Sequence, residues 1–348
     1  MAETDVDLKT LKPGRVCILK PSSLGDIVHA LPVLAALRER WPEAKMAWVV
    51  NKGLRALLDG HPDLDEVIPF DRARAGAGGF GRFLVELRRR RFDVTIDLQG
   101  LLRSAIMTAA TGATVRVGSS RAREGAARFG FYTHRVDHPP LSEVHAVDRL
   151  LAIAAAFGAA VDRPRFALPI ADEDRRWARE ALEGQLGPRL VLNPGARWAT
   201  KRWPPEHFAE VGRRAALTRG ASLVVVGAAE DRALVDALKA RLGLLPCVDL
   251  CGRTSLMRLA AVAAESAVVL SNDTGPLHLA AAAGARVVGL YTCTSPVETG
   301  PYGPRAVAVA TRVACAASYL GKCNRLDCMS ELTADRVWEA VRGQLDAA

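Results

Sequence analysis

The sequence has no run of about 18 uncharged apolar residues, the length that a membrane-spanning helix requires. Its first ten residues are acidic and polar, unlike those of a signal peptide. Aromatic residues make up only 5% of the 348 residues, whereas alanine is abundant. We therefore expect a cytoplasmic α/β protein without a transmembrane segment, in which many helices pack on its strands.

Several motifs of catalysis and metal binding are also missing. No G-x-G-x-x-G or P-loop follows the first predicted strand, and no G-x-S-x-G or Cys–His context supports nucleophilic catalysis. The seven cysteines are an odd number in a long chain, which argues against a disulfide framework. Cys315, Cys323 and Cys328 do not have the spacing of a recognised zinc finger, so metal binding by these thiols stays open. Asp63-Leu64-Asp65 has the D-x-D form of a metal site, but its place before a predicted strand favours a surface turn.

The charge balance indicates an anionic partner. Lysine and arginine number 47 and aspartate and glutamate 38, so the net charge is +9. Such a surplus attracts nucleic acid, acidic lipid or a phosphorylated substrate. A nucleic-acid-binding protein would be expected to show interleaved aromatics or a basic recognition helix, and the sequence has neither.

Apolar runs and helical patterns alternate along the chain, as in a parallel-sheet βα series. The first half predicts strands at 15–20, 45–50, 64–70 and 94–98, and helices at 27–40, 81–91, 103–110 and 142–157. The alternation of strand and helix patterns is interrupted at residues 158–174. The second half predicts strands at 190–192, 223–226, 267–270 and 287–291, and helices at 205–217, 231–242, 255–264, 276–283 and 333–345.

This pattern predicts two Rossmann-like, doubly wound domains that face a central cleft. We place the N-terminal domain at residues 1–165 and the C-terminal domain at residues 166–330. Residues 331–348 form a last helix that could pack back on the N-terminal domain.

The first candidate motif, Lys20 to Asp26, lies between the first predicted strand and the first helix. Ligands of open α/β sheets bind at the carboxyl ends of strands, and small residues such as Ser22, Ser23 and Gly25 let a substrate approach the backbone. Asp26 stands at the helix N-terminus, where a carboxylate either caps free N–H groups or acts as a base. Its position after the first strand favours the functional role.

The second motif opens the second half and runs from Asn193 to Arg197, with Lys201 four residues later. Backbone amides together with Arg197 and Lys201 would suit a diphosphate. A solvated basic loop is the alternative interpretation.

The third motif runs from Ser271 to His278, again between a strand and a helix. Thr274 and the helix N-terminus offer hydrogen-bond donors, and Gly275 allows close approach of a ligand. Asp273 could accept a hydrogen bond from a ribose hydroxyl or cap the helix. His278 could be a catalyst or a structural hydrogen-bonding group.

Six segments, spread in order over nearly the whole chain, together resemble the ADP-heptose:lipopolysaccharide heptosyltransferases of glycosyltransferase family 9. They are ILKPSSLGDIVHALPVLAALRERWP, DVTIDLQGLLRSA, HAVDRLL, LNPGARWATKRWPPEHFAEV, VVVGAAED and LSNDTGPLHLAAAAGARVVGLYTCTSP. HAVDRLL and the Lys20–Asp26 segment are most similar to the heptosyltransferase I type, which adds the first heptose to a Kdo residue.

The resemblance implies the α/β GT-B fold and an inverting transfer of heptose from ADP-heptose to the Kdo-containing inner core of lipopolysaccharide. It implies no cofactor and no metal. The acceptor would be Kdo-containing lipid A at the inner membrane surface, where the enzyme could be peripheral. Asp26 matches the catalytic base. The implied donor-binding residues are Arg197, Lys201, Glu230, Asp273, Thr274, Gly275 and His278; the acceptor-binding residues are Ser22, Ser23, Gly25, Arg103, Arg123 and Arg149.

Two other functions remain as alternatives. One is another GT-B enzyme, such as a nucleotide-sugar epimerase, which would form product from the donor alone. The other is a non-catalytic protein that binds anions or nucleic acid. Ala196 and Arg197 stand where first-heptose members of the family often carry hydroxyl residues, so the donor contacts there differ from the family pattern.

Overall fold

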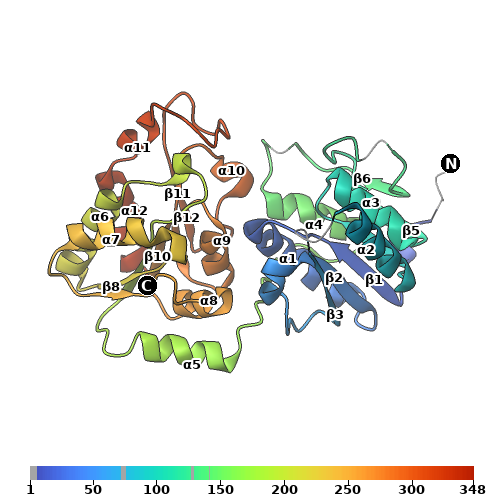
Figure 1. Cartoon of the computed structure of the whole chain (residues 1–348), viewed down its shortest axis with the longest axis horizontal. Helices are drawn as coiled ribbons and strands as arrows, with labels where there is room; N and C mark the ends of the chain where they lie inside the picture. Colours follow the sequence, from blue (N-terminus) through green and yellow to red (C-terminus); the bar gives the residue numbers. More distant parts are fainter. Residues whose placement is uncertain (1–5, 72–75, 127–128, 141) are drawn as a thin grey trace. The chain divides into compact units, whose positions relative to one another are not determined.

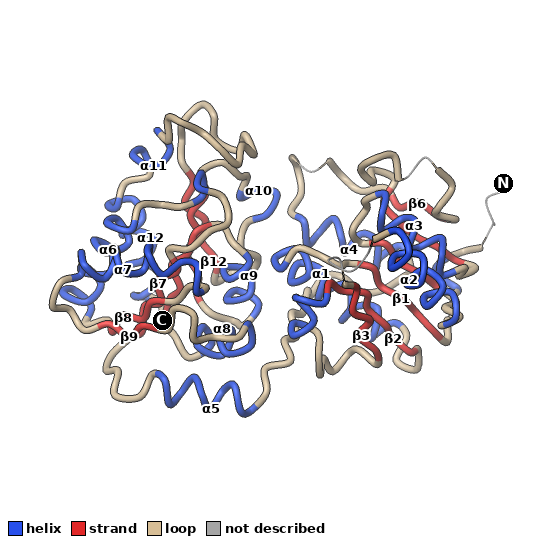
Figure 2. The backbone as a smooth tube through the Cα atoms, viewed as in Figure 1, coloured by secondary structure: helices blue, strands red, loops and turns tan. Residues whose placement is uncertain are grey.

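The computed structural model describes residues 6–71, 76–126, 129–140 and 142–348. The chain divides into two compact units, Met1–Pro169 and Ile170–Ala348, four residues beyond the predicted boundary. Each unit is an inner layer of strands between two layers of helices (Figure 1; Figure 2). Within the described residues, no helix has the length and apolar character needed to cross a membrane.

The first unit contains a parallel sheet with the strand order β3-β2-β1-β4-β5-β6. Its strands are β1 (Arg15–Leu19), β2 (Lys45–Asn51), β3 (Glu66–Phe70), β4 (Val94–Asp97), β5 (Val115–Ser119) and β6 (His134–Val136). Its helices are α1 (Leu24–Arg40), α2 (Ala77–Arg89), α3 (Leu102–Thr111) and α4 (Ala146–Ala156). Helices α1 and α4 pack together, as do α2 and α3.

Strand β1 shows why its residues form a continuous apolar run in the sequence. Cys17 and Leu19 pack with Phe83 and Leu87 of α2, while Val16 and Ile18, the alternate residues of the strand, are also fully buried. Helices cover both faces of a parallel sheet, so both sets of side chains are apolar.

The second unit repeats this topology with the order β12-β11-β10-β7-β8-β9. Its strands are β7 (Arg189–Asn193), β8 (Ser222–Val225), β9 (Cys247–Asp249), β10 (Val268–Asn272), β11 (Arg286–Tyr291) and β12 (Ala306–Ala310). Its helices are α5 (Asp172–Ala181), α6 (Pro205–Arg219), α7 (Arg232–Leu242), α8 (Leu256–Ala264), α9 (Gly275–Ala282), α10 (Pro296–Thr299), α11 (Asp327–Glu331) and α12 (Ala334–Asp346). One core joins α6, α7 and α12 to the sheet, and another joins α5, α8 and α9.

The last helix, α12, differs from the expectation that it packs back on the N-terminal domain. It packs on α6 and on strands β10 to β12 of the second unit. Val337, Val341 and Leu345 belong to the same apolar core as Phe208 of α6. The helix therefore completes one helical layer of the second unit, because its apolar face covers sheet residues that would otherwise be exposed.

Helix α5 begins at the end of the segment, residues 158–174, that the sequence left as an inter-domain region, and the sequence did not predict it. Its first turn carries Asp172, Glu173 and Asp174, which suit a helix N-terminus, and only Ala178 is fully buried. The helix is mostly charged and has few apolar residues, so the search for apolar patterns along the sequence did not reveal it.

Both sheets have a topological switch point where the strand order changes direction. In the first unit it lies between β1 and β4, and in the second unit between β7 and β10. Ligands of such sheets bind outside the carboxyl ends of these strands. The three candidate motifs follow β1, β7 and β10, so the topology places each of them at a switch point.

Gly118 in β5 provides a test of the packing beside the first switch point. A Cβ atom there would lie 2.5 Å from the Tyr132 ring. We expect Gly118→Ala to lower the free energy of unfolding by about 1–3 kcal/mol because the ring must move. Gly343→Ala, in α12 with open space around its Cβ, should instead stabilise by about 0.5–1 kcal/mol. Urea unfolding measures both, and equal effects would contradict the clash.

Candidate active site

A basic cavity of about 420 Å³ opens at the switch point of the first unit. Residues from the loops after β1 and β4, from the segment after β5 and from α4 line it. Its charged or titratable lining residues are Lys20, Asp26, His29, Asp97, Arg121, Arg123, His138 and Arg149. Arginine and lysine outnumber carboxylates in this lining, so the cavity favours an anionic ligand.

Asp26 belongs to the capping box of α1 and also faces this cavity. Ser23 is the N-cap residue, and its backbone N–H and hydroxyl both donate to Asp26 Oδ2, at 2.9 and 2.6 Å. Asp26 is thus the third residue of a capping box rather than the cap itself. The carboxylate remains about half exposed and lines the cavity, so the capping role does not withdraw it from a ligand.

Asp97 at the end of β4 organises the other wall of the cavity. Its Oδ1 accepts from the backbone N–H groups of Gln99 and Gly100, at 2.8 and 3.0 Å. Its Oδ2 accepts from the hydroxyls of Ser104 and Tyr132, at 2.8 and 2.7 Å. Burial raises the pKa of Asp97, and the four donors oppose that rise. Sequence reasoning missed this residue, which shapes the loop after β4.

Two of the predicted acceptor-binding arginines, Arg123 and Arg149, line the basic cavity, together with Arg121, which sequence reasoning missed. The Arg121 guanidinium donates to the carbonyl of His138 at 2.9 Å, and the imidazole of His138 lies 2.7 Å from the Ser119 hydroxyl. These contacts hold the segment after β5 beside the cavity.

The other predicted acceptor-binding residues lie elsewhere. Ser22 and Arg103 line a neighbouring cavity of about 520 Å³. Ser23 is occupied as the α1 cap, and Gly25 lies within the first turn of that helix. The two cavities share Gln99 and Leu101, so the predicted acceptor-binding residues are distributed over two adjoining cavities. The reason is that Arg103 belongs to α3, which packs with α2 rather than with α1 and α4.

The second unit has a cavity of about 630 Å³ at its own switch point. Among the predicted donor-binding residues, Arg197, Glu230, Thr274 and Gly275 line it. Thr274 is the N-cap of α9, so the positive end of this helix faces the cavity. Free N–H groups at such a helix end bind phosphate readily.

Gly195 shows that the loop after β7 needs a residue without a side chain. A Cβ atom there would lie 2.3 Å from Asp231 Oδ2. The same oxygen accepts from the backbone N–H of Ala228 at 3.0 Å. Sequence reasoning named the neighbouring Glu230 but not Asp231, which ties the loop after β8 to the floor of this cavity.

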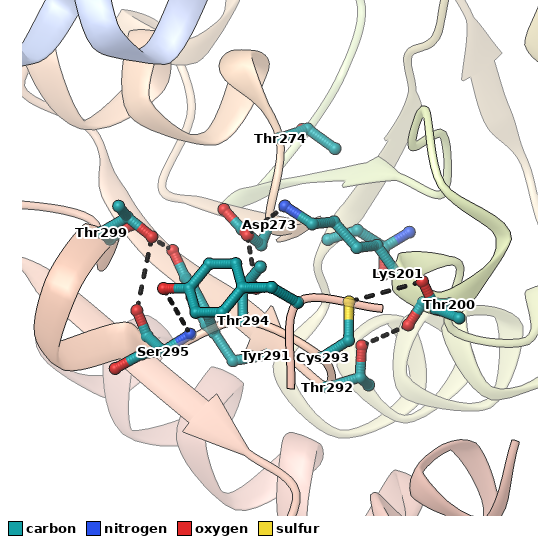
Figure 3. Close-up of polar contacts among 12 residues, drawn as sticks. Thr200, Lys201, Asp273, Thr274, Tyr291, Thr292, Cys293, Thr294, Ser295 and Thr299 are labelled. Carbon is teal, nitrogen blue, oxygen red and sulfur yellow. Dashed lines mark hydrogen bonds and ion pairs between the residues drawn. The ribbon is translucent and has the colours of Figure 1, made fainter. Parts of the chain in front are cut away.

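Lys201, Asp273 and His278 do not line this cavity. They form a largely buried polar network around Asp273, of which Figure 3 shows Lys201, Asp273 and Thr294. Lys201 Nζ and the Thr294 hydroxyl both donate to Asp273 Oδ2, at 2.5 and 2.6 Å. His278 Nε2 lies 3.5 Å from Asp273 Oδ1. Burial acts to raise the pKa of Asp273, but His278 and Lys201 outweigh it and hold that pKa well below its ordinary value.

Four cysteines, Cys293, Cys315, Cys323 and Cys328, line a separate cavity of about 330 Å³ in the second unit. The Cys293 thiol donates to the Thr200 hydroxyl at 3.4 Å (Figure 3). All seven cysteines are free thiols. Across the described parts of the chain, no three His, Cys, Asp or Glu side chains are gathered where they could hold a metal ion.

The D-x-D pair near β3 is held by arginines. Asp65 accepts from Arg38 at 2.7 Å, and Asp63 lies 3.0 Å from Arg165. Asp65 also accepts from the backbone N–H of Met46 at 2.8 Å, which fixes the turn before β3. These contacts give both carboxylates a structural role in the turn before β3, although Asp63 is buried and not on the surface as the sequence pattern suggested.

Two Rossmann-like units, one with a carboxylate in a basic cavity and one with a helix N-terminus directed at a second cavity, define a glycosyltransferase of the GT-B class. The family model of glycosyltransferase family 9 (heptosyltransferase) matches residues 80–328. The chain belongs to this family, which confirms the resemblance drawn from its motifs.

Known relatives match over most of their length. The lipopolysaccharide heptosyltransferase 1 of Pseudomonas aeruginosa is 34% identical, over 87% of this chain and 85% of its own. The lipopolysaccharide core heptosyltransferase OpsX of Haemophilus influenzae is 29% identical, over 85% and 84%. The solved structure of the E. coli heptosyltransferase WaaC with ADP is 26% identical, with a TM-score of 0.75 over 95% of this chain and 99% of that one.

The buried network makes a prediction about stability. Lys201→Met should lower the free energy of unfolding at neutral pH by about 3 kcal/mol, since Asp273 stays buried without its lysine. The folded-state pKa of Asp273 lies below its ordinary value of 3.8, so this stabilisation is present above that value and is lost as the pH falls through the folded pKa. The deficit should therefore shrink in acid. Urea unfolding at neutral pH and near pH 3 measures it, with Lys201→Arg as the charge-retaining control. A deficit that does not change with pH would contradict the pairing.

Proposed function

We propose that this enzyme transfers a heptose, with inversion, from ADP-heptose to the Kdo-containing inner core of lipopolysaccharide. The observation that carries the proposal is the half-exposed Asp26 carboxylate in a basic cavity at the first switch point. Family membership supports the sugar-transfer chemistry. The lipopolysaccharide heptosyltransferase 1 of Pseudomonas aeruginosa is 34% identical to this chain.

The donor is proposed to bind in the second unit. Its diphosphate would lie at the N-terminus of α9, near Thr274 and Gly275, with Arg197 supplying a positive charge. Glu230 would contact the nucleoside. Lys201, Asp273 and His278 would hold the loop after β10 in place, and Lys201 would add positive charge close to the leaving diphosphate. A WaaC structure with ADP-2-deoxy-2-fluoro heptose, 26% identical, supports an ADP-sugar as the ligand.

The acceptor is proposed to bind in the basic cavity of the first unit. Kdo is an acidic sugar, and Arg121, Arg123 and Arg149 offer the cations that a carboxylate requires. Ser22 and Arg103 would contact a more distant part of the acceptor in the adjoining cavity. Because the acceptor is a membrane lipid, we propose that the enzyme works at the inner membrane surface.

The reaction is a single displacement. Asp26 takes the proton from the acceptor hydroxyl as that oxygen forms a bond to the anomeric carbon. The bond from the anomeric carbon to the diphosphate breaks, and ADP leaves with the electron pair. Donors at the N-terminus of α9 and the nearby cations stabilise the charge that develops on the diphosphate. This scheme uses no metal and no cofactor.

Asp26→Asn separates the catalytic role of this residue from its capping role. Asparagine keeps an oxygen that can accept from Ser23, so we expect the thermal midpoint to stay close to that of the wild type. It cannot accept a proton, so turnover should fall roughly 10²–10⁴-fold while both substrates still bind. Two measurements on this variant separate the two roles: turnover with ADP-heptose and a Kdo-bearing acceptor, and the thermal midpoint. Near-normal turnover would defeat the base assignment.

The acceptor assignment predicts unequal effects of arginine removal. Arg149→Ala should raise the KM for the acceptor by about 10–100-fold, the loss of a charge-assisted contact, with little change for ADP-heptose. The salt dependence of acceptor binding should weaken at the same time. Arg103→Ala should have a smaller effect because this exposed residue lines the adjoining cavity. Arg241→Ala, on the exposed surface of α7, serves as a control. Equal effects of Arg149→Ala on both substrates would contradict the assignment.

A further inference from the structure

Lys20, the first residue after β1, joins the two loops of the first switch point. Its Nζ donates to the carbonyl of Leu98, after β4, at 3.0 Å. The same nitrogen lies 3.9 Å from Asp26 Oδ1, in the first turn of α1. The Lys20 carbonyl accepts from the indole N–H of Trp48 at 3.1 Å, which anchors its backbone. One side chain thus contacts the loop after β4 and the candidate base.

The lysine ammonium is buried, whereas the carboxylate that it faces is not. The Lys20 side chain is 7% exposed and that of Asp26 is 46% exposed. Burial lowers the pKa of Lys20, and the negative charges of Asp26 and Asp97 oppose that effect. A buried ammonium costs free energy unless anionic or carbonyl oxygens surround it. Its position on the cavity wall, where a leucine or methionine would pack without this cost, calls for a functional reason.

The two oxygens of Asp26 have different neighbours. Oδ2 accepts from the Ser23 N–H and hydroxyl, which form the capping box. Oδ1 is the oxygen that faces Lys20. The capping box therefore fixes one oxygen of the carboxylate, and Lys20 places a positive charge beside the other.

We propose that Lys20 is the positioning residue of the catalytic base, which holds Asp26 ionised and directs its Oδ1 toward the acceptor hydroxyl. This inference rests on the proposed function. Lys20 exchanges no proton in the reaction: the acceptor proton passes to Asp26, the new bond forms between the acceptor oxygen and the anomeric carbon, and ADP leaves. A cation close to a carboxylate favours its charged form, so Lys20 keeps the base available at lower pH.

The experiment must separate the effect of Lys20 on Asp26 from the effects of the other charged groups around the cavity. Besides Lys20, the titratable or charged groups around the cavity are His29 on α1, Asp97 on β4, Arg121 and Arg123 after β5, His138 after β6 and Arg149 on α4. Lys20 Nζ lies at ion-pair distance from Asp26 Oδ1, 3.9 Å. We therefore expect removal of the Lys20 charge to act directly on the base, and Arg149 provides the comparison.

The test is the dependence of kcat/KM on pH, whose acidic limb reports protonation of the base in the free enzyme. In Lys20→Met, we expect this limb to move to higher pH by about one unit, the low end of the effect of a lost opposite charge, because Asp26 is half exposed. Lys20→Arg retains the charge and should keep the limb within a few tenths of a unit of wild type. Arg149→Met should raise the acceptor KM and leave the limb close to its original position.

A merely structural role for Lys20 would lower the thermal midpoint of Lys20→Met without moving the limb, and this result would overturn the proposal. Lys20→Gln, which is also neutral but still offers a donor to Leu98, is prepared in parallel. Failure of both neutral variants to fold would assign Lys20 to stability and would likewise overturn the proposal. Asp26→Asn separates failure of this proposal from failure of the proposed function. Normal turnover in Asp26→Asn would mean that Asp26 is not the base. A large loss of turnover in Asp26→Asn, together with an unmoved acidic limb in Lys20→Met, would contradict only the role of Lys20.

Discussion

The burial of both faces of each parallel sheet is the constraint on which the rest of the structure depends. Helices cover the sheets on both sides, so most strand residues are apolar. The polar side chains of the site therefore gather near the ends of strands, and the loops diverge most where the strand order reverses. The basic cavity after β1 and β4 and the cavity after β7 and β10 are the two places of this kind.

Charges at these strand ends are partly or fully removed from water, and each therefore needs partners. Lys20 uses Leu98 and Asp26, and Asp97 uses four hydrogen-bond donors. In the second unit, Asp273 is surrounded by Lys201, Thr294 and His278. Such networks fix the conformation of loops that carry no regular structure of their own, because a displaced loop would leave a buried charge unpaired.

The sequence predicted most long elements of the fold because they contain many apolar residues, as in α1 and α6, which each bury at least five residues. It missed α5, which buries a single alanine completely, and the five-residue strands β5 and β12. It also missed the strands β6 and β9, whose three residues are too few to show a period. The candidate base and the α9 loop were identified because each stands directly between a strand and a helix. Asp97 and Asp231 were not identified, although both shape the cavities.

By itself, the sequence determined the two α/β halves, the family, and the polar loops that end β1, β7 and β10, because these depend on local patterns along the chain. Only the tertiary structure decided which polar residues meet. It separated Arg103 from Arg123 and Arg149 by placing it on a different helix layer, and it paired Lys201 with Asp273, 72 residues away. Contacts between residues so far apart follow from strand order and helix packing, which no local pattern encodes.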